Sequence, residues 1–270
     1  MLHVITVHYR SPQWIEIQTR YLREHVSVPY QTWTSLEGID PSYAVHFDRV
    51  FEQRGRHPGK LNHLALEVAA EAAEDDLLMF LDGDAFPIAD PMPLIEEALA
   101  RAPLVAVRRA ENVEDPQPHP CFCVTTVATW RSLPGDWSGG YTWSGVDGRP
   151  VTDVGANLLR ALELSATPWV PLLRSNPMSL DPLFFAIYGD IVYHHGAGFR
   201  EGEFSRAHLA QAPKRRPLPR GRLLRSLLRR SNRRRRLSWE RTTRGRYLEH
   251  SRAIHEQIRR GGSDWLAELR

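Results

Sequence analysis

Residues 77–84 read LLMFLDGD, and this stretch decides the expected fold. The five consecutive apolar residues at 77–81 are typical of a buried strand. Asp82, Gly83 and Asp84 follow that strand directly. In an open parallel sheet, ligands bind beyond the carboxyl ends of the strands. We therefore expect both carboxylates to lie at a functional edge of a sheet.

Strands and helices alternate around this stretch. Helices are predicted at 14–24, 60–73 and 93–102, and strands at 3–7, 30–35 and 104–108. Residues 43–51 are ambiguous and could supply a third strand. This alternation predicts an α/β fold with a Rossmann-like, doubly wound and mostly parallel sheet that is flanked by helices.

The second half of the chain is less regular. Residues 111–150 are rich in Pro, Gly and Trp, and we expect them to form irregular surface. A helix is predicted at 153–164, and strands are predicted at 184–188 and 191–194. The remainder, from residue 206 to residue 270, is expected to be a basic helical extension.

Composition excludes several classes of protein. With 270 residues, 42% hydrophobic and 25% charged, the chain is neither disordered, collagen-like nor coiled-coil. No stretch approaches the roughly 18 apolar residues of a membrane-spanning helix, and the first residues lack the features of a signal peptide. Cys121 and Cys123 are too few for a disulfide framework and are expected to be thiols on one face of a strand. We expect a cytoplasmic protein.

Basic residues are unevenly distributed. The formal net charge is +3, yet residues 212–237 hold twelve Lys and Arg residues and no acid, so the rest of the chain is mildly acidic. Leucines recur there at helical spacing between arginines, which predicts an amphipathic cationic helix. Three uses stay open. They are peripheral contact with an anionic inner membrane face, docking onto the body or a second subunit, and nucleic-acid binding, which the scarcity of interleaved aromatic residues disfavours.

The acidic pair suits a metal ion. Asp82 and Asp84 can both turn toward one hard cation, and Gly83 allows the backbone to approach closely. Mg²⁺ or Mn²⁺ held in this way keeps positions open for phosphate oxygens. The alternative is a solvated acidic turn, but the placement after a buried strand favours the metal site.

Three motifs in this order resemble GT-A-type glycosyltransferases of the family 2-like superfamily that uses a D-x-D motif. They are the first strand and its loop (residues 5–14), HPGKLN at 57–62 and FLDGD at 80–84. The resemblance covers residues 1–205. It implies that Mn²⁺ or Mg²⁺ on Asp84 binds the diphosphate of a nucleotide-sugar donor (UDP, GDP or dTDP), and that Asp82 binds the metal through water or binds the donor ribose. It further implies that the nucleotide is bordered by Thr6, His8, Tyr9 and Arg10, with Lys60 and Asn62 near its phosphates or ribose.

A late histidine fits the same resemblance. HHGAG at 194–198 contains a His-x-x-Gly motif that begins at His195, and several GT-A families complete the metal shell with such a histidine. His195 is preferred over His194 through the glycine spacing alone, and an imidazole ligand would favour manganese. Arg200 and Arg206 could pair with the diphosphate. The alternative is an ordinary histidine pair without a metal.

Two further features have two interpretations each. Asp153 follows Thr152 at a predicted helix start, so it is either part of an N-cap or the general base of an inverting transfer. Trp130, Trp137 and Trp143 could form a stacking platform for a sugar acceptor, or they could belong to the core.

We therefore expect a metal-dependent transferase of the hexosyltransferase type, which moves a sugar to an acceptor hydroxyl; a lipid-linked acceptor would benefit from membrane contact. Residues 1–205 would form the catalytic domain, with a nucleotide-sugar half (about 1–110) and an acceptor half (about 111–205). One alternative is a non-catalytic membrane- or nucleic-acid-binding adaptor. Another is a sugar nucleotidyltransferase, which the glycine-free loop at 8–12 disfavours.

Overall fold

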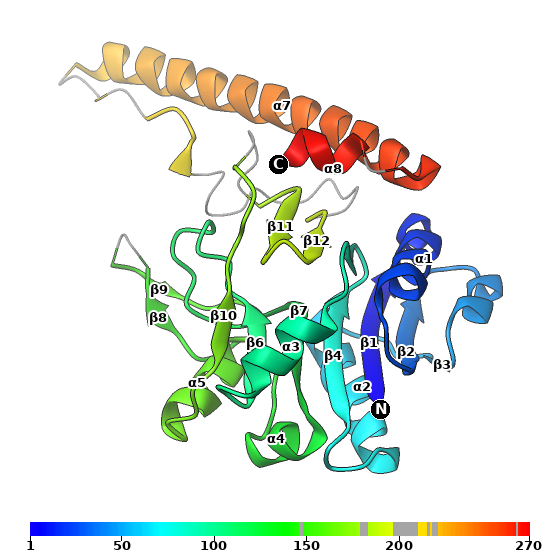
Figure 1. Ribbon diagram of the computed structural model, residues 1–270. Helices are drawn as coiled ribbons and strands as arrows, with labels where there is room; N and C mark the ends of the chain where they lie inside the picture. The colour runs from blue at the N-terminus through cyan, green and yellow to red at the C-terminus, as the bar shows by residue number, and fades with distance from the viewer. Residues whose placement is uncertain (146–147, 179–182, 197–209, 215–216, 218–220, 263) are drawn as a thin grey trace.

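A seven-stranded sheet forms the centre of the computed structural model. The structure describes the chain except residues 146–147, 179–182, 197–209, 215–216, 218–220 and 263 (Figure 1). Its strand order is β10-β6-β7-β4-β1-β2-β3, and β7 runs antiparallel to both of its neighbours, whereas the other neighbours are parallel. The predicted α/β fold with a mostly parallel sheet is confirmed. The strands are β1 (Leu2–Tyr9), β2 (Tyr30–Glu37), β3 (Arg49–Phe51), β4 (Leu77–Asp82), β6 (Leu104–Val107), β7 (His119–Thr126) and β10 (Val170–Leu172).

Alternating side chains of β4 divide the core into two layers. Leu78 and Phe80 pack on one face of the sheet, together with apolar side chains of α2 (His57–Glu71), α4 (Val127–Ser132) and α5 (Ala156–Leu164). Met79 and Leu81 pack on the other face with α1 (Ile15–His25) and α3 (Met92–Leu99). Since both faces are covered by helices, the strand is apolar at every position until it reaches the edge.

The segment expected to be irregular surface is partly core, and that expectation is wrong for β7 and α4. β7 lies between β4 and β6 with seven of its eight residues buried. Its register with β6 shifts between Ala106 and Val107, which marks a bulge. As a result, Cys121 and Cys123 belong to opposite core layers. The expectation that they share one face of the strand is therefore wrong. Both are buried free thiols. Beyond α4, β8 (Trp143–Ser144) and β9 (Pro150–Val151) form a hairpin.

A second, antiparallel sheet brings a late part of the chain to the end of β4. Its strands are β5 (Ala85–Pro87), β12 (Val192–His194) and β11 (Ala186–Tyr188), with β12 in the middle. The register pairs His194 with Ala85, the residue after Asp84. This pairing therefore carries a histidine to the acidic turn from more than a hundred residues away in the chain.

The C-terminal helices cover this second sheet. α7 (Arg222–Arg260) runs across one end of the molecule, with α8 (Asp264–Leu269) beside its second half (Figure 1). Tyr247, Ile254 and Ile258 of α7 are buried in a third core cluster with Tyr193 and Trp265. In contrast, Leu224 and Leu227 in the first half of α7 are 58% and 62% exposed.

Within the described part of the chain, no helix combines the length and apolarity of a membrane span. Short 3₁₀ segments at Pro12–Trp14 and Pro41–His46 complete the described elements, so the ambiguous 43–51 region is only partly strand.

Candidate active site

Polar residues from five strand ends meet at one edge of the large sheet. The parallel strands β4, β1, β2 and β6 end there, and β7 begins there because it runs antiparallel. The order along this edge is therefore Arg109 after β6, His119 at the start of β7, Asp82 at the end of β4, Tyr9 at the end of β1 and Glu37 at the end of β2. The winding of the sheet reverses between β1 and β4, since β2 and β3 lie on one side of β1 and β4 lies on the other, and a ligand is expected at such a point.

Gln18 of α1 holds the turn that carries the two aspartates. Its amide nitrogen donates to the carbonyl oxygens of Asp82 (2.8 Å) and Ala85 (2.7 Å). Its amide oxygen accepts from the Thr6 hydroxyl and lies 3.1 Å from Nε2 of His8. Gln18 is completely buried. Thr6, which we expected beside a nucleotide, is thus part of the scaffold behind the turn.

Gly83 is required by the close approach of β1. A Cβ atom at this position would lie 2.6 Å from the carbonyl oxygen of Val7 and 2.8 Å from Nδ1 of His8. Distances this short are not tolerated, so any other residue would push the turn away from β1. The glycine therefore lets the turn pack directly against the neighbouring strand.

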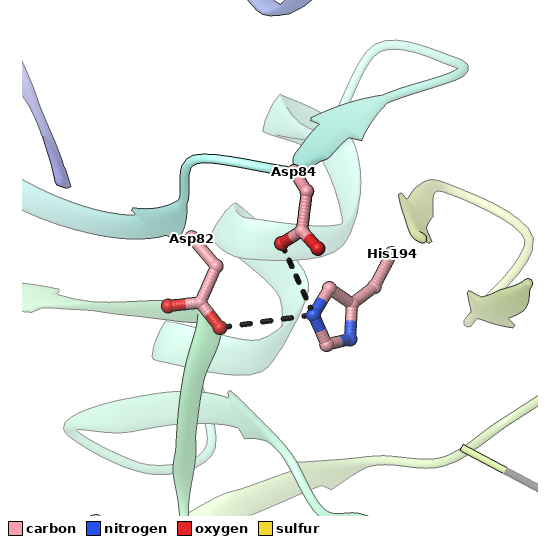
Figure 2. Close-up of side chains that lie close together, drawn as sticks. All are labelled: Asp82, Asp84 and His194. Atoms are coloured by element: carbon pink, nitrogen blue, oxygen red, sulfur yellow. Dashed lines mark ion pairs between the residues drawn. The ribbon is translucent and has the colours of Figure 1, made fainter. Parts of the chain in front are cut away.

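Asp82, Asp84 and His194 form a compact cluster of potential metal ligands. One ligand atom from each residue lies within 4.8 Å of the others. Nε2 of His194 is 3.4 Å from Oδ1 of Asp84 and 3.7 Å from Oδ2 of Asp82, and all three side chains point toward one another (Figure 2). Oδ1 of Asp82 is buried and accepts no hydrogen bond from the described residues, although Nε2 of His57 lies 3.2 Å away. Two carboxylates and one imidazole fit a divalent ion such as Mn²⁺.

His195 is not part of this cluster, although the glycine spacing favoured it over His194. Its Nδ1 lies 2.8 Å from the Tyr193 hydroxyl, and its Nε2 lies 2.5 Å from Oγ of Ser251 on α7. Successive residues at a strand end point to opposite sides, so His194 faces the carboxylates while His195 faces the third core cluster. Burial lowers the pKa of His195 to about 3.

Electrostatics distinguish the histidines around Asp82. Burial alone would lower the pKa of His194, but the Cys121 thiol and the Asp84 carboxylate raise it well above its ordinary value. The pKa of His119, whose Nδ1 lies 4.0 Å from Asp82, is lowered well below its ordinary value by burial and by Arg109. His57, His119 and Arg109 were not predicted as site residues, because only the strand order brings them to Asp82.

A cleft of about 510 Å³ surrounds this cluster. Of the predicted donor-binding residues, His8, Tyr9, Lys60 and Asp82 line it, whereas Thr6, Arg10 and Asn62 do not. Among the described residues, the cleft is lined by Val7, His8, Tyr9, Ser11, Trp14, Gly55, Arg56, His57, Lys60, Asp82, Gly83, Asp84, Arg109, His119, Val154 and His194.

Lys60 provides a buried cation on the β1–β2 side of the cleft. It is 2% exposed, it forms an ion pair with Glu37, and its Nζ lies 5.2 Å from the ring centre of Tyr9. Hydrogen bonding to Lys60 lowers the pKa of Glu37. Arg10 instead lies over the Tyr9 ring at 5.0 Å. Asn62 faces away from the cleft, where it donates to Asp136 and accepts from the backbone of Trp137.

Asp153 lies at the opposite side of the cleft. Its carboxylate is 37% exposed, is 3.7 Å from the guanidinium of Arg109, and accepts a hydrogen bond from the backbone of Val154, which lines the cleft. Helix α5 starts only at Ala156 with Gly155 as its N-cap, and no side chain caps it. The N-cap interpretation of Asp153 is therefore wrong.

Two of the three tryptophans that were considered for an acceptor platform belong to the core. Trp130 and Trp137 are 3% and 0% exposed and pack against the ring of Phe80 at 4.6 and 5.1 Å, because they fill the core layer beside α2. Neither offers a ring face to a ligand. Trp143 is partly exposed on β8. Arg200 and Arg206 lie outside the described residues.

Comparisons with known proteins gave similarity in structure only. No protein-family model matches the chain, and no curated protein sequence matches it. Three solved structures that it resembles are the glycosyltransferase GlyE of Streptococcus pneumoniae (TM-score 0.41, 12% identity, 63% of this chain and 44% of that one), TarS of S. aureus (TM-score 0.38, 9% identity, 51% and 30%) and the galactosyltransferase LgtC in complex with donor and acceptor sugar analogs (TM-score 0.36, 12% identity, 59% and 70%). The chain thus spans less than half the length of GlyE and TarS.

Proposed function

We propose that this protein is a metal-dependent glycosyltransferase, which moves a sugar from a nucleotide-diphosphate donor to an acceptor hydroxyl. The observation that carries the proposal is the cluster of Asp82, Asp84 and His194, whose ligand atoms lie within 4.8 Å of one another in the cleft at the edge of the sheet. Cationic groups line the same cleft on both sides of the cluster, Lys60 on one and Arg109 on the other. This arrangement suits a negatively charged substrate that lies across a metal ion.

Asp82, Asp84 and His194 would hold the ion, and the imidazole favours Mn²⁺ over Mg²⁺. When bound, a divalent ion stabilises the charge that develops on a departing diphosphate as a Lewis acid. Lys60 adds a buried positive charge for the phosphates, and Tyr9 lines the cleft beside it. The proposed contribution of Asn62 is indirect, because its hydrogen bonds hold Asp136 and the backbone of Trp137. Arg200 remains a proposed diphosphate partner on its sequence position alone.

Asp153 is the proposed general base. Its carboxylate is accessible to solvent beside the cleft, at the end that lies across the metal cluster from Lys60. In an inverting transfer the acceptor oxygen bonds to the anomeric carbon as the bond to the diphosphate breaks, and Asp153 takes the proton of the acceptor hydroxyl. The diphosphate leaves with the electron pair of the broken bond. Trp143, which is partly exposed, stays a proposed acceptor contact.

The first half of α7 is proposed to contact an anionic membrane surface. Arg229, Arg230 and Arg233 are exposed there, as are Leu224 and Leu227. A helix with cationic side chains and exposed leucines can lie at the interface of an anionic bilayer. Such contact would place the cleft near a lipid-linked acceptor.

Calorimetry tests the enzymatic proposal directly. UDP, GDP and dTDP are titrated into the wild type, Asp84→Asn and the exposed control Asp75→Asn, each with Mn²⁺ or with EDTA. We expect one nucleotide to bind the wild type and Asp75→Asn only with Mn²⁺, and to lose at least about tenfold in affinity in Asp84→Asn. If no nucleotide binds the wild type under either condition, the glycosyltransferase proposal is wrong.

A further inference from the structure

Arg109 is a buried guanidinium in the cleft that lacks a close acceptor. Its side chain is 13% exposed and lines the cleft. Among the described residues, the buried Nε has no hydrogen-bond partner, and the carboxylate oxygen of Asp153 that pairs with the guanidinium lies 3.7 Å away, beyond hydrogen-bonding distance. Burying a charged donor without an acceptor costs folding free energy. The fold therefore retains a costly group at this position.

Two nearby arginines, Arg108 and Arg174, each have an acceptor for Nε, whereas Arg109 has none among the described residues. Nε of Arg108 donates to the carbonyl oxygen of Asp115 at 3.1 Å. Nε of Arg174 donates to the side chain of Asn176 at 3.0 Å. Burial acts to lower the pKa of Arg109, but Tyr188, Asp153 and further neighbours outweigh it and raise the pKa. The guanidinium thus stays charged, and its Nε has no acceptor in the part of the chain that the structure describes.

The strand order gives this charge a definite place relative to the nucleotide. Arg109 follows β6, which is separated from β4 by β7, whereas Tyr9 and Lys60 lie on the other side of β4. Adjacent strands are about 4.8 Å apart, so Arg109 is about 10 Å along the edge from the acidic turn. If the nucleotide lies on the β1–β2 side, Arg109 faces the sugar or the acceptor.

We propose that Arg109 forms an oxyanion subsite, which binds a carboxylate or phosphate carried by the transferred sugar or by the acceptor. This inference rests on the proposed function and specifies its substrate as acidic. The planar guanidinium can donate two parallel hydrogen bonds to either group, and its buried Nε would gain an acceptor. Asp153 lies beside the subsite as a like charge, so it would weaken the binding of such an anion.

Matched pairs of charged and neutral ligands test the subsite. The donor arm compares UDP-glucose with UDP-glucuronate, or the equivalent pair for whichever nucleotide binds. The acceptor arm adds methyl glucoside, methyl glucuronide or glucose 6-phosphate to protein saturated with nucleotide and Mn²⁺. Binding is measured by calorimetry for the wild type, Arg109→Gln, Asp153→Asn and the exposed control Arg101→Gln, which is remote from the cleft.

We expect one charged ligand to bind the wild type at least about tenfold more tightly than its neutral twin. Arg109→Gln should abolish this preference and leave the affinity for the free nucleotide diphosphate within about twofold, whereas Asp153→Asn should increase the preference. The arm that shows the preference identifies whether the donor or the acceptor carries the anion. Binding of nucleotide without any charge preference, or an equal loss of nucleotide affinity in Arg109→Gln, would overturn the subsite alone. Failure of every nucleotide to bind the wild type would overturn the proposed function as well.

Discussion

Nε2 of His194 lies 3.4 Å from Oδ1 of Asp84, and the pairing of β12 with β5 sets this distance. The candidate metal cluster is thus made by two parts of the fold. The large sheet supplies the acidic turn at the end of β4, and the small sheet supplies the histidine. Because α7 packs on the small sheet, the position of His194 also depends on the C-terminal helices.

Adjacent histidines provide a direct test of this arrangement. His194→Ala should lower the affinity for Mn²⁺ by at least about tenfold, because it removes the imidazole that faces both carboxylates. His195→Ala should keep the Mn²⁺ affinity and lower the free energy of unfolding by about 1–3 kcal/mol, since the Tyr193 and Ser251 hydroxyls lose a buried partner. Calorimetric Mn²⁺ titration and denaturant unfolding measure the two effects. A loss of Mn²⁺ affinity in His195→Ala alone would instead support the assignment based on glycine spacing.

Gln18 should be as important to the turn as the aspartates themselves. Gln18→Ala leaves the carbonyl oxygens of Asp82 and Ala85, the Thr6 hydroxyl and His8 without their buried partner. We expect the free energy of unfolding to fall by about 2–5 kcal/mol, and we expect the protein that stays folded to bind Mn²⁺ more weakly. Denaturant unfolding measures the stability, and Mn²⁺ titration at denaturant concentrations below the unfolding transition measures the binding.

Glu16 offers the matched control for Gln18, because it lies on the same helix and is exposed. Glu16→Ala should change the free energy of unfolding by about 0.5 kcal/mol or less and leave Mn²⁺ binding intact. Equal effects of the two substitutions would show that Gln18 does not hold the turn.

Replacement of two glycines near the cleft by alanine should have opposite effects, one harmful to Mn²⁺ binding and the other favourable to stability. Gly83→Ala places a Cβ 2.6 Å from the carbonyl oxygen of Val7, so the turn must move and Mn²⁺ affinity should fall by about tenfold or more. In Gly59→Ala the new Cβ meets nothing within 4 Å, and alanine favours helix α2, so stability should rise by about 0.5–1 kcal/mol. Thermal unfolding and Mn²⁺ titration distinguish them. Normal Mn²⁺ binding by Gly83→Ala would show that the exact turn geometry is not needed.

The sequence predicts those parts of the fold that depend on local pattern. The apolar run at 77–81 with its acidic end, and the apolar face of α2, are visible because strand and helix periodicity are local properties. A strand was expected at Cys121 and Cys123, but the buried and central position of β7 was not, because Pro and Trp around it are typical of surface loops. The burial of Trp130 and Trp137 is decided by packing against Phe80.

The local pattern points to the acidic turn of Asp82 and Asp84, and the resemblance added His8, Tyr9 and Lys60, which line the same cleft. Sequence reasoning missed His57, His119 and Arg109, because they reach the cleft from three other elements that only the fold brings together. Which of His194 and His195 faces the aspartates depends on how β12 pairs with β5. Side chains alternate between the two faces of a strand, but the sequence of β12 alone does not tell which face is turned toward the aspartates. The hydrogen bonds that turn Asn62 of α2 toward Asp136 and the backbone of Trp137 are likewise a tertiary property.

The arginine-rich half of α7 should bind anionic vesicles independently of the cleft. Replacement of Arg229, Arg230 and Arg233 by Gln removes three exposed charges, each worth about 1 kcal/mol at such a surface, so the affinity for vesicles that contain phosphatidylglycerol should fall about a hundredfold. Co-sedimentation with vesicles, with phosphatidylcholine alone as the neutral reference, measures this. Metal-dependent nucleotide binding should stay unchanged, because none of the three residues lines the cleft. Equal binding to neutral vesicles, or tighter binding to duplex DNA or RNA than to anionic vesicles, would contradict the membrane assignment and return this segment to docking or nucleic-acid contact.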